Sequence, residues 1–310
     1  MPLEDECIAL ATDEGYVAQA CIVLASYALS NPLNRRDTFV FTNNLSEGGI
    51  RMLRTTAAAF GLKLTLQEMD GSLIREFSRH TKNMIPHVSE ASYGKILIPR
   101  SLPETYKRCL ILDCDILVKG SLDRLFETDL QGRSLGAAID AMEPTKSATR
   151  LGLSKKAFYF NSGVLLVDLK QWNLEKPLSR AFDLIAKNHR KMMFMEQDLL
   201  NLLFNGQLQQ LDSTWNAIIV IVPRGYVRNW KGVPEDQAIL HFAGELKPWH
   251  EFYHPAVRNI YLEYSKLCSW IKIPCLGPSG EVQTKCAVML AKQFGLQALI
   301  EKYTREKDDA

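Results

Sequence analysis

Short apolar runs alternate with longer segments of helical periodicity in the first third of the chain. Three runs have the length and spacing of buried strands, at residues 7–11, 38–42 and 63–67. Between them, apolar residues recur at helical spacing over residues 17–28 and 46–57, and Ser46 is a suitable N-cap for the second segment. This alternation predicts an α/β fold with a mainly parallel sheet flanked by helices.

The same pattern continues through the middle of the chain. Further strands are predicted at residues 109–112, 135–139, 164–167 and 238–240. Further helices are predicted at residues 91–98, where Pro99 ends the helix, and at residues 177–188 and 196–204. In sheets of this kind, ligands bind beyond the carboxyl ends of the strands, so the residues that follow each strand are candidates for function.

After residue 250 the pattern weakens and is broken by two prolines. We therefore expect one domain over residues 1–255 and a C-terminal extension over residues 256–310. Residues 287–300 have the spacing of an amphipathic helix. We expect this helix to pack on the domain, and peripheral contact with a membrane is the alternative.

Charge and composition narrow the class of protein. The 310 residues include 37 Lys and Arg against 35 Asp and Glu, which argues against a nucleic-acid-binding protein with a concentrated basic face. No apolar run reaches the roughly 20 residues that cross a bilayer, and the acidic first residues do not resemble a secretory signal. The seven cysteines form no C-x-x-C pair, which favours reduced core thiols. These features predict a cytoplasmic protein.

Two carboxylates, Asp113 and Asp115, directly follow the predicted strand 109–112. They would repel each other unless a cation or protons hold them, and hard oxygen ligands suit Mn²⁺ or Mg²⁺. A solvated turn is one alternative. A phosphatase of the haloacid-dehalogenase type, with the first Asp as nucleophile, is another, although Ile116-Leu117 stand where those enzymes usually have Gly-Thr.

A second polar segment follows the predicted strand 238–240. His241 can offer a neutral imidazole to a divalent cation. Gly244 allows the backbone to approach a phosphate closely, and Lys247 can neutralise a pyrophosphate oxygen. Alone, these residues are also typical of a structural turn.

Two further segments carry polar groups beside apolar ones. Asn161 directly precedes the predicted strand 164–167 within Phe-Asn-Ser-Gly-Val, so its amide needs a defined partner. Gln197 and Asp198 lie at the start of a predicted helix, where acidic residues also serve as caps. Each signal is compatible with a purely structural role.

Together and in this order, the four segments resemble glycosyltransferase family 8. The set comprises Asp-x-Asp, Phe-Asn-Ser-Gly-Val, Glu-Gln-Asp and His-Phe-x-Gly-x-x-Lys-Pro-Trp, and the likeness covers residues 5–250. The resemblance implies a retaining enzyme of the GT-A fold that uses UDP-galactose or UDP-glucose with Mn²⁺ or Mg²⁺. The chain is most similar to bacterial lipopolysaccharide galactosyl- and glucosyltransferases.

The resemblance also assigns residues to roles. The implied metal ligands are Asp113, Asp115 and His241. The implied nucleotide contacts are Ala11, Thr12, Asp13, Tyr16 and Cys114, with Gly244 and Lys247 on the diphosphate. The implied neighbours of the transferred hexose are Lys95, Asp140, Asn161, Gln197 and Asp198.

Two departures from the family pattern concern the nucleotide and the sugar. Gly15 stands where the family often has Asn, and Glu196 stands where it usually has Asp. Because one extra methylene beside the sugar changes which hexose fits, galactose and glucose both remain open.

The implied mechanism is departure of UDP, stabilised by the metal and Lys247, with attack by an acceptor hydroxyl from the same face. Gln197 is a poor nucleophile for the alternative double displacement, for which Asp198 is a second candidate. We expect a glycan or glycolipid acceptor. A UDP-sugar-binding protein without turnover and the phosphatase remain as alternatives.

Overall fold

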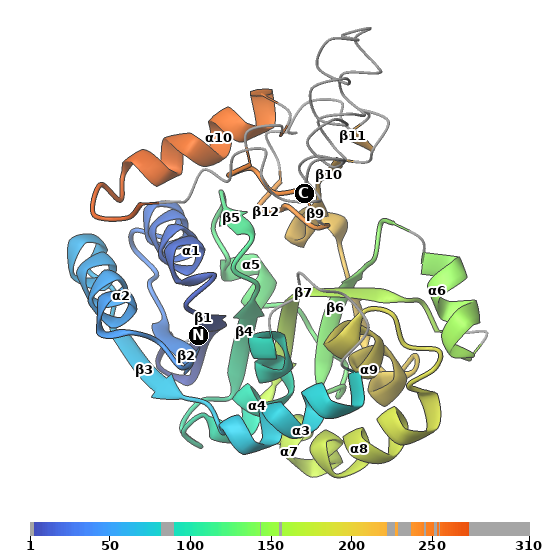
Figure 1. Cartoon of the computed structure of the whole chain (residues 1–310). Coiled ribbons are helices and arrows are strands. Elements are labelled where there is room, and N and C mark those ends of the chain that lie inside the picture. Colours follow the sequence, from blue (N-terminus) through green and yellow to red (C-terminus); the bar gives the residue numbers. More distant parts are fainter. Residues whose placement is uncertain are drawn as a thin grey trace, which may run out of the picture.

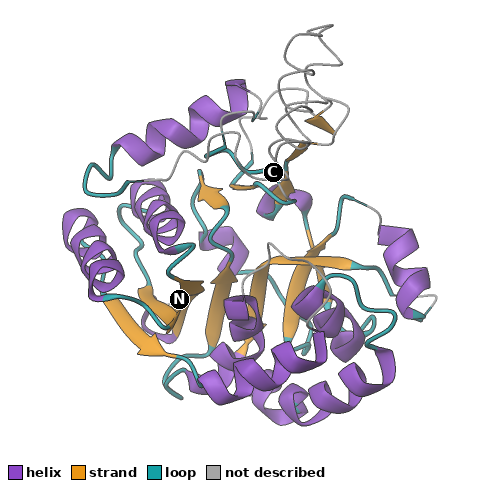
Figure 2. Ribbon diagram, viewed as in Figure 1, coloured by secondary structure: helices purple, strands orange, loops and turns teal. Residues whose placement is uncertain are grey.

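A seven-stranded sheet forms the centre of the protein, with helices on both faces (Figures 1 and 2). The computed structural model describes residues 3–81, 90–142, 144–154, 157–221, 227–228, 237–244, 246–250, 253 and 255–272. The strand order is β3-β2-β1-β4-β7-β6-β8. These strands are β1 (Glu6–Asp13), β2 (Asp37–Asn43), β3 (Leu64–Glu68), β4 (Arg108–Leu112), β6 (Leu135–Ile139), β7 (Phe160–Asp168) and β8 (Gln209–Leu211).

The sheet is parallel except at β7, which runs antiparallel to both of its neighbours, β4 and β6. The prediction of a mainly parallel sheet is therefore confirmed. The reversal has a consequence for function, because β7 begins at the edge where β4 and β6 end. Leu112 at the end of β4 pairs with Val164, and the Asp113 amide donates to the Gly163 carbonyl at 2.9 Å.

The helices divide between the two faces of the sheet. They are α1 (Val17–Ser30), α2 (Glu47–Phe60), α3 (Gly71–Thr81), α4 (Gly94–Ser101), α5 (Asp123–Phe126), α6 (Pro144–Leu151), α7 (Leu169–Glu175), α8 (Pro177–Asn188), α9 (Met195–Phe204) and α10 (Pro255–Lys266). Apolar residues of α1, α2 and α5 pack on one face, and those of α3, α4, α7, α8 and α9 pack on the other. Because side chains alternate along a strand, β1 sends Ile8 and Leu10 into one core and Cys7 and Ala9 into the other.

A smaller sheet brings the second half of the chain to the end of β4. Its order is β5 (Ile116–Val118), β12 (Ile239–His241) and β9 (Ala217–Ile218). His241 pairs with Ile116, and the Phe242 amide donates to the Asp115 carbonyl at 2.9 Å. β10 (Val220–Ile221) and β11 (Val227–Arg228) pair as a separate two-stranded antiparallel sheet. The small sheet therefore fixes His241 beside the Asp-x-Asp turn.

Most predicted elements coincide with observed ones. The Ser46 hydroxyl accepts a hydrogen bond from the Gly49 amide at 3.1 Å, which confirms the predicted cap of α2. The predicted end of a helix at Pro99 is wrong, because α4 continues to Ser101. Proline has a helical φ and removes only one hydrogen bond, and buried Ile98 and Pro99 pack the last turn in place.

One strand boundary and one helix differ from the sequence-based expectation. β7 begins at Phe160, so Asn161 lies inside the strand rather than before it. α10 was not predicted, and it contributes buried Val257 and Tyr261 to a core shared with Ile22 of α1. The predicted helix at residues 287–300 lies outside the described residues.

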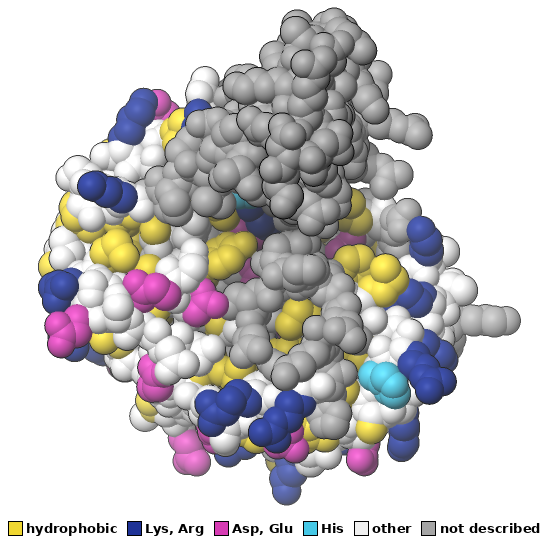
Figure 3. Space-filling model, viewed as in Figure 1, with side chains coloured by type: hydrophobic (Ala, Val, Ile, Leu, Met, Phe, Trp, Pro, Cys, Tyr) yellow, Lys and Arg dark blue, Asp and Glu magenta, His cyan; other side chains and the backbone are white. Residues whose placement is uncertain are grey.

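The cysteines and charges of the described residues agree with the composition. Five cysteines are free and buried: Cys7, Cys21, Cys109, Cys114 and Cys268. Lys and Arg side chains are distributed around the edge of the face in Figure 3, together with Asp and Glu. Within the described part of the chain, no helix is long and apolar enough to cross a membrane.

Candidate active site

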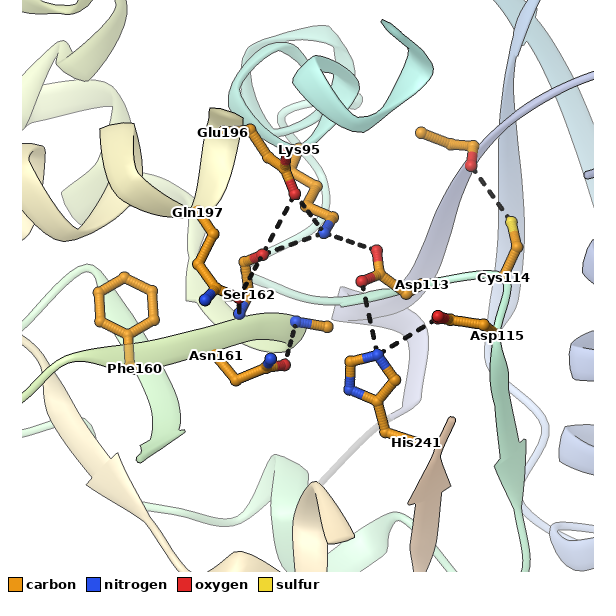
Figure 4. Close-up of polar contacts among 12 residues, drawn as sticks. Lys95, Asp113, Cys114, Asp115, Phe160, Asn161, Ser162, Glu196, Gln197 and His241 are labelled. Atoms are coloured by element: carbon orange, nitrogen blue, oxygen red, sulfur yellow. Dashed lines mark hydrogen bonds and ion pairs between the residues drawn. The ribbon is translucent and has the colours of Figure 1, made fainter. Parts of the chain in front are cut away.

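Two carboxylates and an imidazole meet where β4 and β12 end. Asp113 and Asp115 occupy the turn between β4 and β5, and His241 is the last residue of β12. The His241 Nε2 atom lies 3.3 Å from Asp115 Oδ1 and 4.0 Å from Asp113 Oδ2 (Figure 4). One ligand atom from each residue lies within 4.8 Å of the other two, which is the spacing of a metal site. The structure thus brings the three predicted ligands together.

Two buried lysines hold the outer oxygens of these carboxylates. Lys95 Nζ lies 2.6 Å from Asp113 Oδ1, and Lys247 Nζ donates to Asp115 Oδ2. The remaining oxygens, Asp113 Oδ2 and Asp115 Oδ1, are the ones that face His241. Oxygen ligands with one imidazole suit Mn²⁺ or Mg²⁺, so the residues present fit the implied metal.

Burial and charge make the two carboxyl groups different. Burial, helped by the Asp115 carboxylate, raises the pKa of Asp113, although Lys95 opposes the shift. Burial also opposes ionisation of Asp115, but Lys247 and His241 outweigh it and hold the pKa of Asp115 well below its usual range. An added cation should therefore stabilise the ionised form of Asp113 more than that of Asp115.

Lys95 connects this cluster to helix α9. Its ammonium contacts Glu196 Oε1 at 3.0 Å and Ser162 Oγ at 3.2 Å, in addition to Asp113. Although burial lowers it, the pKa of Lys95 is raised by Asp113 and Glu196, so the ammonium stays charged. Lys95 is the second residue of α4. It follows Gly94, whose lack of a side chain allows α4 to approach Ala11 of β1.

A hydrogen-bond network of amides and hydroxyls around the Asp140 carboxylate forms the other side of the site. Gln197 accepts from the Ser162 amide at 3.0 Å and donates to Asp140 Oδ2 at 3.2 Å and to the Tyr159 hydroxyl at 3.0 Å. Asn161 Nδ2 also donates to Asp140 Oδ2, at 3.2 Å. These side chains come from the end of β6, the start of β7 and the first turn of α9, so the reversed β7 assembles this side.

Asp198 is fully buried and is joined to this network through the Tyr159 hydroxyl. Arg150 binds both of its oxygens at 2.8 and 2.9 Å, and the Tyr159 hydroxyl donates to Oδ1 at 2.6 Å. The amides of Met193 and Phe194 donate to Oδ2 at 2.6 and 2.9 Å. Protein groups therefore bind both Asp198 oxygens, and the structure does not bring this carboxylate to the cluster of Asp113, Asp115 and His241. A carboxylate in the first turn of a helix binds nearby backbone amides instead.

The predicted nucleotide residues lie at the carboxyl end of β1, next to the Asp-x-Asp turn. Ala11, Thr12 and Asp13 are the last residues of β1, and the Cys114 thiol donates to the Ala11 carbonyl at 3.2 Å. Tyr16 lies edge-to-face against Trp249, with ring centroids 6.0 Å apart. The segment that begins at His241 therefore contacts the loop that follows β1.

The turn after β12 supplies the remaining predicted residues. Gly244 is exposed and has a φ of +92°, a conformation that favours glycine. Lys247 also donates to the Phe242 carbonyl at 2.9 Å, which closes the turn on itself. Gly244 and Lys247 thus belong to the same turn as the His241 ligand.

Several polar residues of the site were absent from the sequence-based set. Ser162 lies within the Phe-Asn-Ser-Gly-Val segment and Tyr159 directly precedes it, so this motif could have identified both residues. Asn216 follows the short helix η3 (Ser213–Trp215), belongs to none of the motifs, and is 2% exposed. Gly163 has a packing role, because a Cβ there would lie 2.3 Å from His241 Cε1.

Comparison with known proteins gives a consistent result. The model of glycosyl transferase family 8 matches residues 7–252. Glycosyltransferase GlyE of Streptococcus pneumoniae serotype 4 is 31% identical over 225 residues, which are 67% of this chain and 50% of GlyE. The chain thus spans half the length of GlyE. Lipopolysaccharide 1,2-glucosyltransferase of Escherichia coli is 27% identical over 272 residues, which are 84% of this chain and 78% of that protein.

Solved structures show the same architecture. The crystal structure of galactosyltransferase LgtC, in complex with donor and acceptor sugar analogs, superposes with a TM-score of 0.72 at 23% identity. The match covers 86% of this chain and 97% of LgtC. The apo form of GlyE superposes with a TM-score of 0.62 at 23% identity, over 86% of this chain and 62% of GlyE.

Proposed function

The chain belongs to glycosyltransferase family 8, and we propose that it transfers galactose or glucose from a UDP-sugar to an acceptor hydroxyl with retention of configuration. The observation that carries this proposal is the position of the Asp113, Asp115 and His241 cluster beside the amide network around Gln197. A metal site holds the diphosphate of a nucleotide-sugar, and amides beside it can bind the hydroxyls of the sugar.

Asp113, Asp115 and His241 would hold Mn²⁺ or Mg²⁺, which supplies positive charge to the departing UDP when it is bound. The residues of the chain add to that charge. Lys247 places an ammonium at the same carboxylate cluster, and the backbone of Gly244 is free to approach a phosphate. Ala11, Thr12, Asp13, Tyr16 and Cys114 would line the nucleotide pocket, as the family resemblance implies.

Attack from the leaving-group face accounts best for retention. A double displacement requires a carboxylate that can reach the sugar, and Asp198 is buried with both oxygens bound. Asp140 accepts from Asn161 and Gln197. In the same-face route, these groups orient the hexose while a phosphate oxygen of UDP receives the proton of the acceptor.

We propose a glycan or glycolipid acceptor, as in lipopolysaccharide or another glycoconjugate. This rests on the names of the relatives, among them the Escherichia coli lipopolysaccharide glucosyltransferase. Peripheral contact with a membrane stays a prediction, as does a cytoplasmic location. The boundary between a domain at residues 1–255 and an extension at 256–310 also remains a prediction.

The decisive experiment measures UDP release from a panel of UDP-sugars, with Mn²⁺ and with chelator. We expect slow metal-dependent hydrolysis of one UDP-hexose, and loss of about 10³-fold in Asp115→Asn because a metal ligand is removed. Asp183→Asn, an exposed substitution on α8, is the matched control and should leave release unchanged.

The other outcomes separate the alternatives. UDP binding in the presence of Mn²⁺ without release from any donor, even when acceptor glycans are added, would favour a binding protein without turnover. Cleavage of simple phosphate esters without preference for a nucleotide would favour the phosphatase. Absence of UDP binding would contradict the proposed function itself.

A further inference from the structure

A continuous chain of side-chain hydrogen bonds links the metal cluster to the sugar side of the site. The His241 ring nitrogen Nδ1 lies 2.9 Å from Asn216 Oδ1, and Asn216 Nδ2 donates to Asn161 Oδ1 at 2.9 Å. Asn161 Nδ2 in turn donates to Asp140 Oδ2, the atom that also receives Gln197 Nε2. Asn161 and Asn216 are buried, so water does not compete for these bonds.

The direction of every donor in this chain follows from its two fixed ends. An ionised carboxylate only accepts, so the amide nitrogen of Asn161 must face Asp140. The Asn161 oxygen then faces the Gly163 amide, a fixed donor at 2.9 Å, and the amide nitrogen of Asn216. The Asn216 oxygen is left for His241, which must therefore carry its proton on Nδ1.

With its Nδ1 proton held by Asn216, His241 presents Nε2 to Asp113 and Asp115 (Figure 4), and in the neutral imidazole that nitrogen offers its lone pair to a cation. The opposite tautomer would point an N–H at the metal position and could not ligate. Gly163 contributes to the same arrangement, because a side chain there would collide with the imidazole. Two carboxylate oxygens and the Nε2 atom therefore converge on one position.

We propose that Asn216 is a positioning residue that sets the tautomer of His241 and ties the metal site to Asn161 and Asp140 on the sugar side. The metal part of this inference rests on the proposed function, whereas the tautomer is a property of the metal-free chain. Partners of ligating histidines orient the ring and raise its basicity, and their loss commonly weakens metal binding by about 10- to 100-fold.

The first test observes the tautomer directly in the metal-free protein. Long-range ¹H–¹⁵N spectra of protein labelled at its six histidines distinguish the two tautomers, and His241→Gln assigns the relevant signal. We expect the Nδ1–H form in the natural chain and in Asn216→Asp, which keeps an acceptor for His241. We expect that form to be lost in Asn216→Ala.

The second test separates the two hydrogen bonds of Asn216 by titration with Mn²⁺ alone, followed by electron paramagnetic resonance. Asn216→Ala should weaken Mn²⁺ binding by about 10- to 100-fold. Asn216→Asp should bind Mn²⁺ within about threefold of the natural chain, because a carboxylate–histidine pair also supports a metal. It should nevertheless lose about tenfold in turnover, since it cannot donate to Asn161.

Asn31→Ala is the matched control for loss of a buried amide. Asn31 is 3% exposed, accepts from the Leu122 amide at 2.9 Å and donates to the Tyr27 carbonyl at 3.1 Å, at the end of α1. It should lower the melting temperature without changing the His241 signal or Mn²⁺ affinity. An Nδ1–H signal that persists in folded Asn216→Ala, or unchanged Mn²⁺ affinity there, would overturn the proposal. Neither result would bear on UDP-sugar turnover by the natural chain.

Discussion

The two sides of the site are stabilised by different kinds of interaction. On the metal side, Lys95 and Lys247 each neutralise one oxygen of a carboxylate, and the inner oxygens of Asp113 and Asp115 still face His241. On the sugar side, the amide of Gln197 has a partner for each of its polar atoms. The metal side therefore requires a cation for completion, whereas the sugar side is already ordered without its ligand.

This difference implies that the cation and the sugar bind for different physical reasons. A cation that binds on the metal side relieves the repulsion between the two carboxylates. Metal binding should therefore raise the free energy of unfolding. A sugar that enters the other side meets groups whose directions are already set, which limits the entropy lost on binding. Changes on the metal side should thus alter how strongly Mn²⁺ stabilises the fold, whereas changes on the sugar side should affect stability equally with and without Mn²⁺.

Lys247→Met gives the largest expected effect and tests the metal side. It leaves Asp115 as a largely buried charge without its ammonium, and breaking such a pair costs about 3 kcal/mol of unfolding free energy. Turnover should fall by about 100-fold or more. Urea unfolding with and without Mn²⁺ checks the prediction, because Mn²⁺ should restore more stability in the variant than in the natural chain. Equal stabilisation of both proteins by Mn²⁺ would contradict the coupling.

Asp198→Asn comes next and tests whether the sugar side depends on the buried Arg150–Asp198 pair. The substitution breaks the bidentate pair with Arg150, at a cost of about 3 kcal/mol. Because Tyr159 joins Asp198 to Gln197, the Gln197 amide should shift and kcat should fall by about 10- to 100-fold. Steady-state kinetics should show little change in KM for the donor. A rise in KM at unchanged kcat would instead indicate that Asp198 contacts the sugar.

The sequence predicted the metal side better than the sugar side, and the reason is physical. Asp113 and Asp115 stand two residues apart after a buried strand, so their mutual repulsion is visible in the sequence alone. Asp198 was assigned to the sugar because a carboxylate at a helix start has the same sequence whether it faces a ligand or the backbone. Asn216 carried no signal, since its role depends on the register between β9 and β12.

The fold shows the same division between local and long-range information. The first strands and α1 follow from periodicity, which is a local property of the chain. The early start of β7 at Phe160 did not, because Asn161 and Ser162 are polar residues buried by partners that are distant in sequence. Tertiary contacts, rather than local preference, decide such positions.

Tyr159→Phe sharpens the comparison by removing one hydroxyl from the sugar side. The hydroxyl donates to Asp198 and accepts from Gln197, so its loss should cost about 1–2 kcal/mol and lower kcat several-fold. Tyr27→Phe is the matched control, because the buried Tyr27 hydroxyl accepts from the Arg36 amide at 2.6 Å, away from the site. Both variants should lose similar melting temperature in calorimetry, and only Tyr159→Phe should lose turnover. Equal turnover in the two variants would mean that the Tyr159 hydroxyl does not help to position Gln197.

The last expected effect appears only at acid pH and returns to the metal side, at His250. Burial, with help from the Lys247 ammonium, lowers the pKa of His250 to about 4. In the unfolded chain this histidine titrates near its usual value of about 6.5, so the unfolded state binds the proton first as the pH falls. The free energy of unfolding therefore decreases between about pH 6.5 and 4, by at most about 1.4 kcal/mol per pH unit, and this contribution is complete above pH 6.5. His250→Gln should remove this part of the acid sensitivity, as the difference between urea unfolding curves of the two proteins across that range would show. Parallel pH profiles would mean that the imidazole titrates alike in the folded and unfolded chains, and hence that neither burial nor the Lys247 ammonium lowers its pKa.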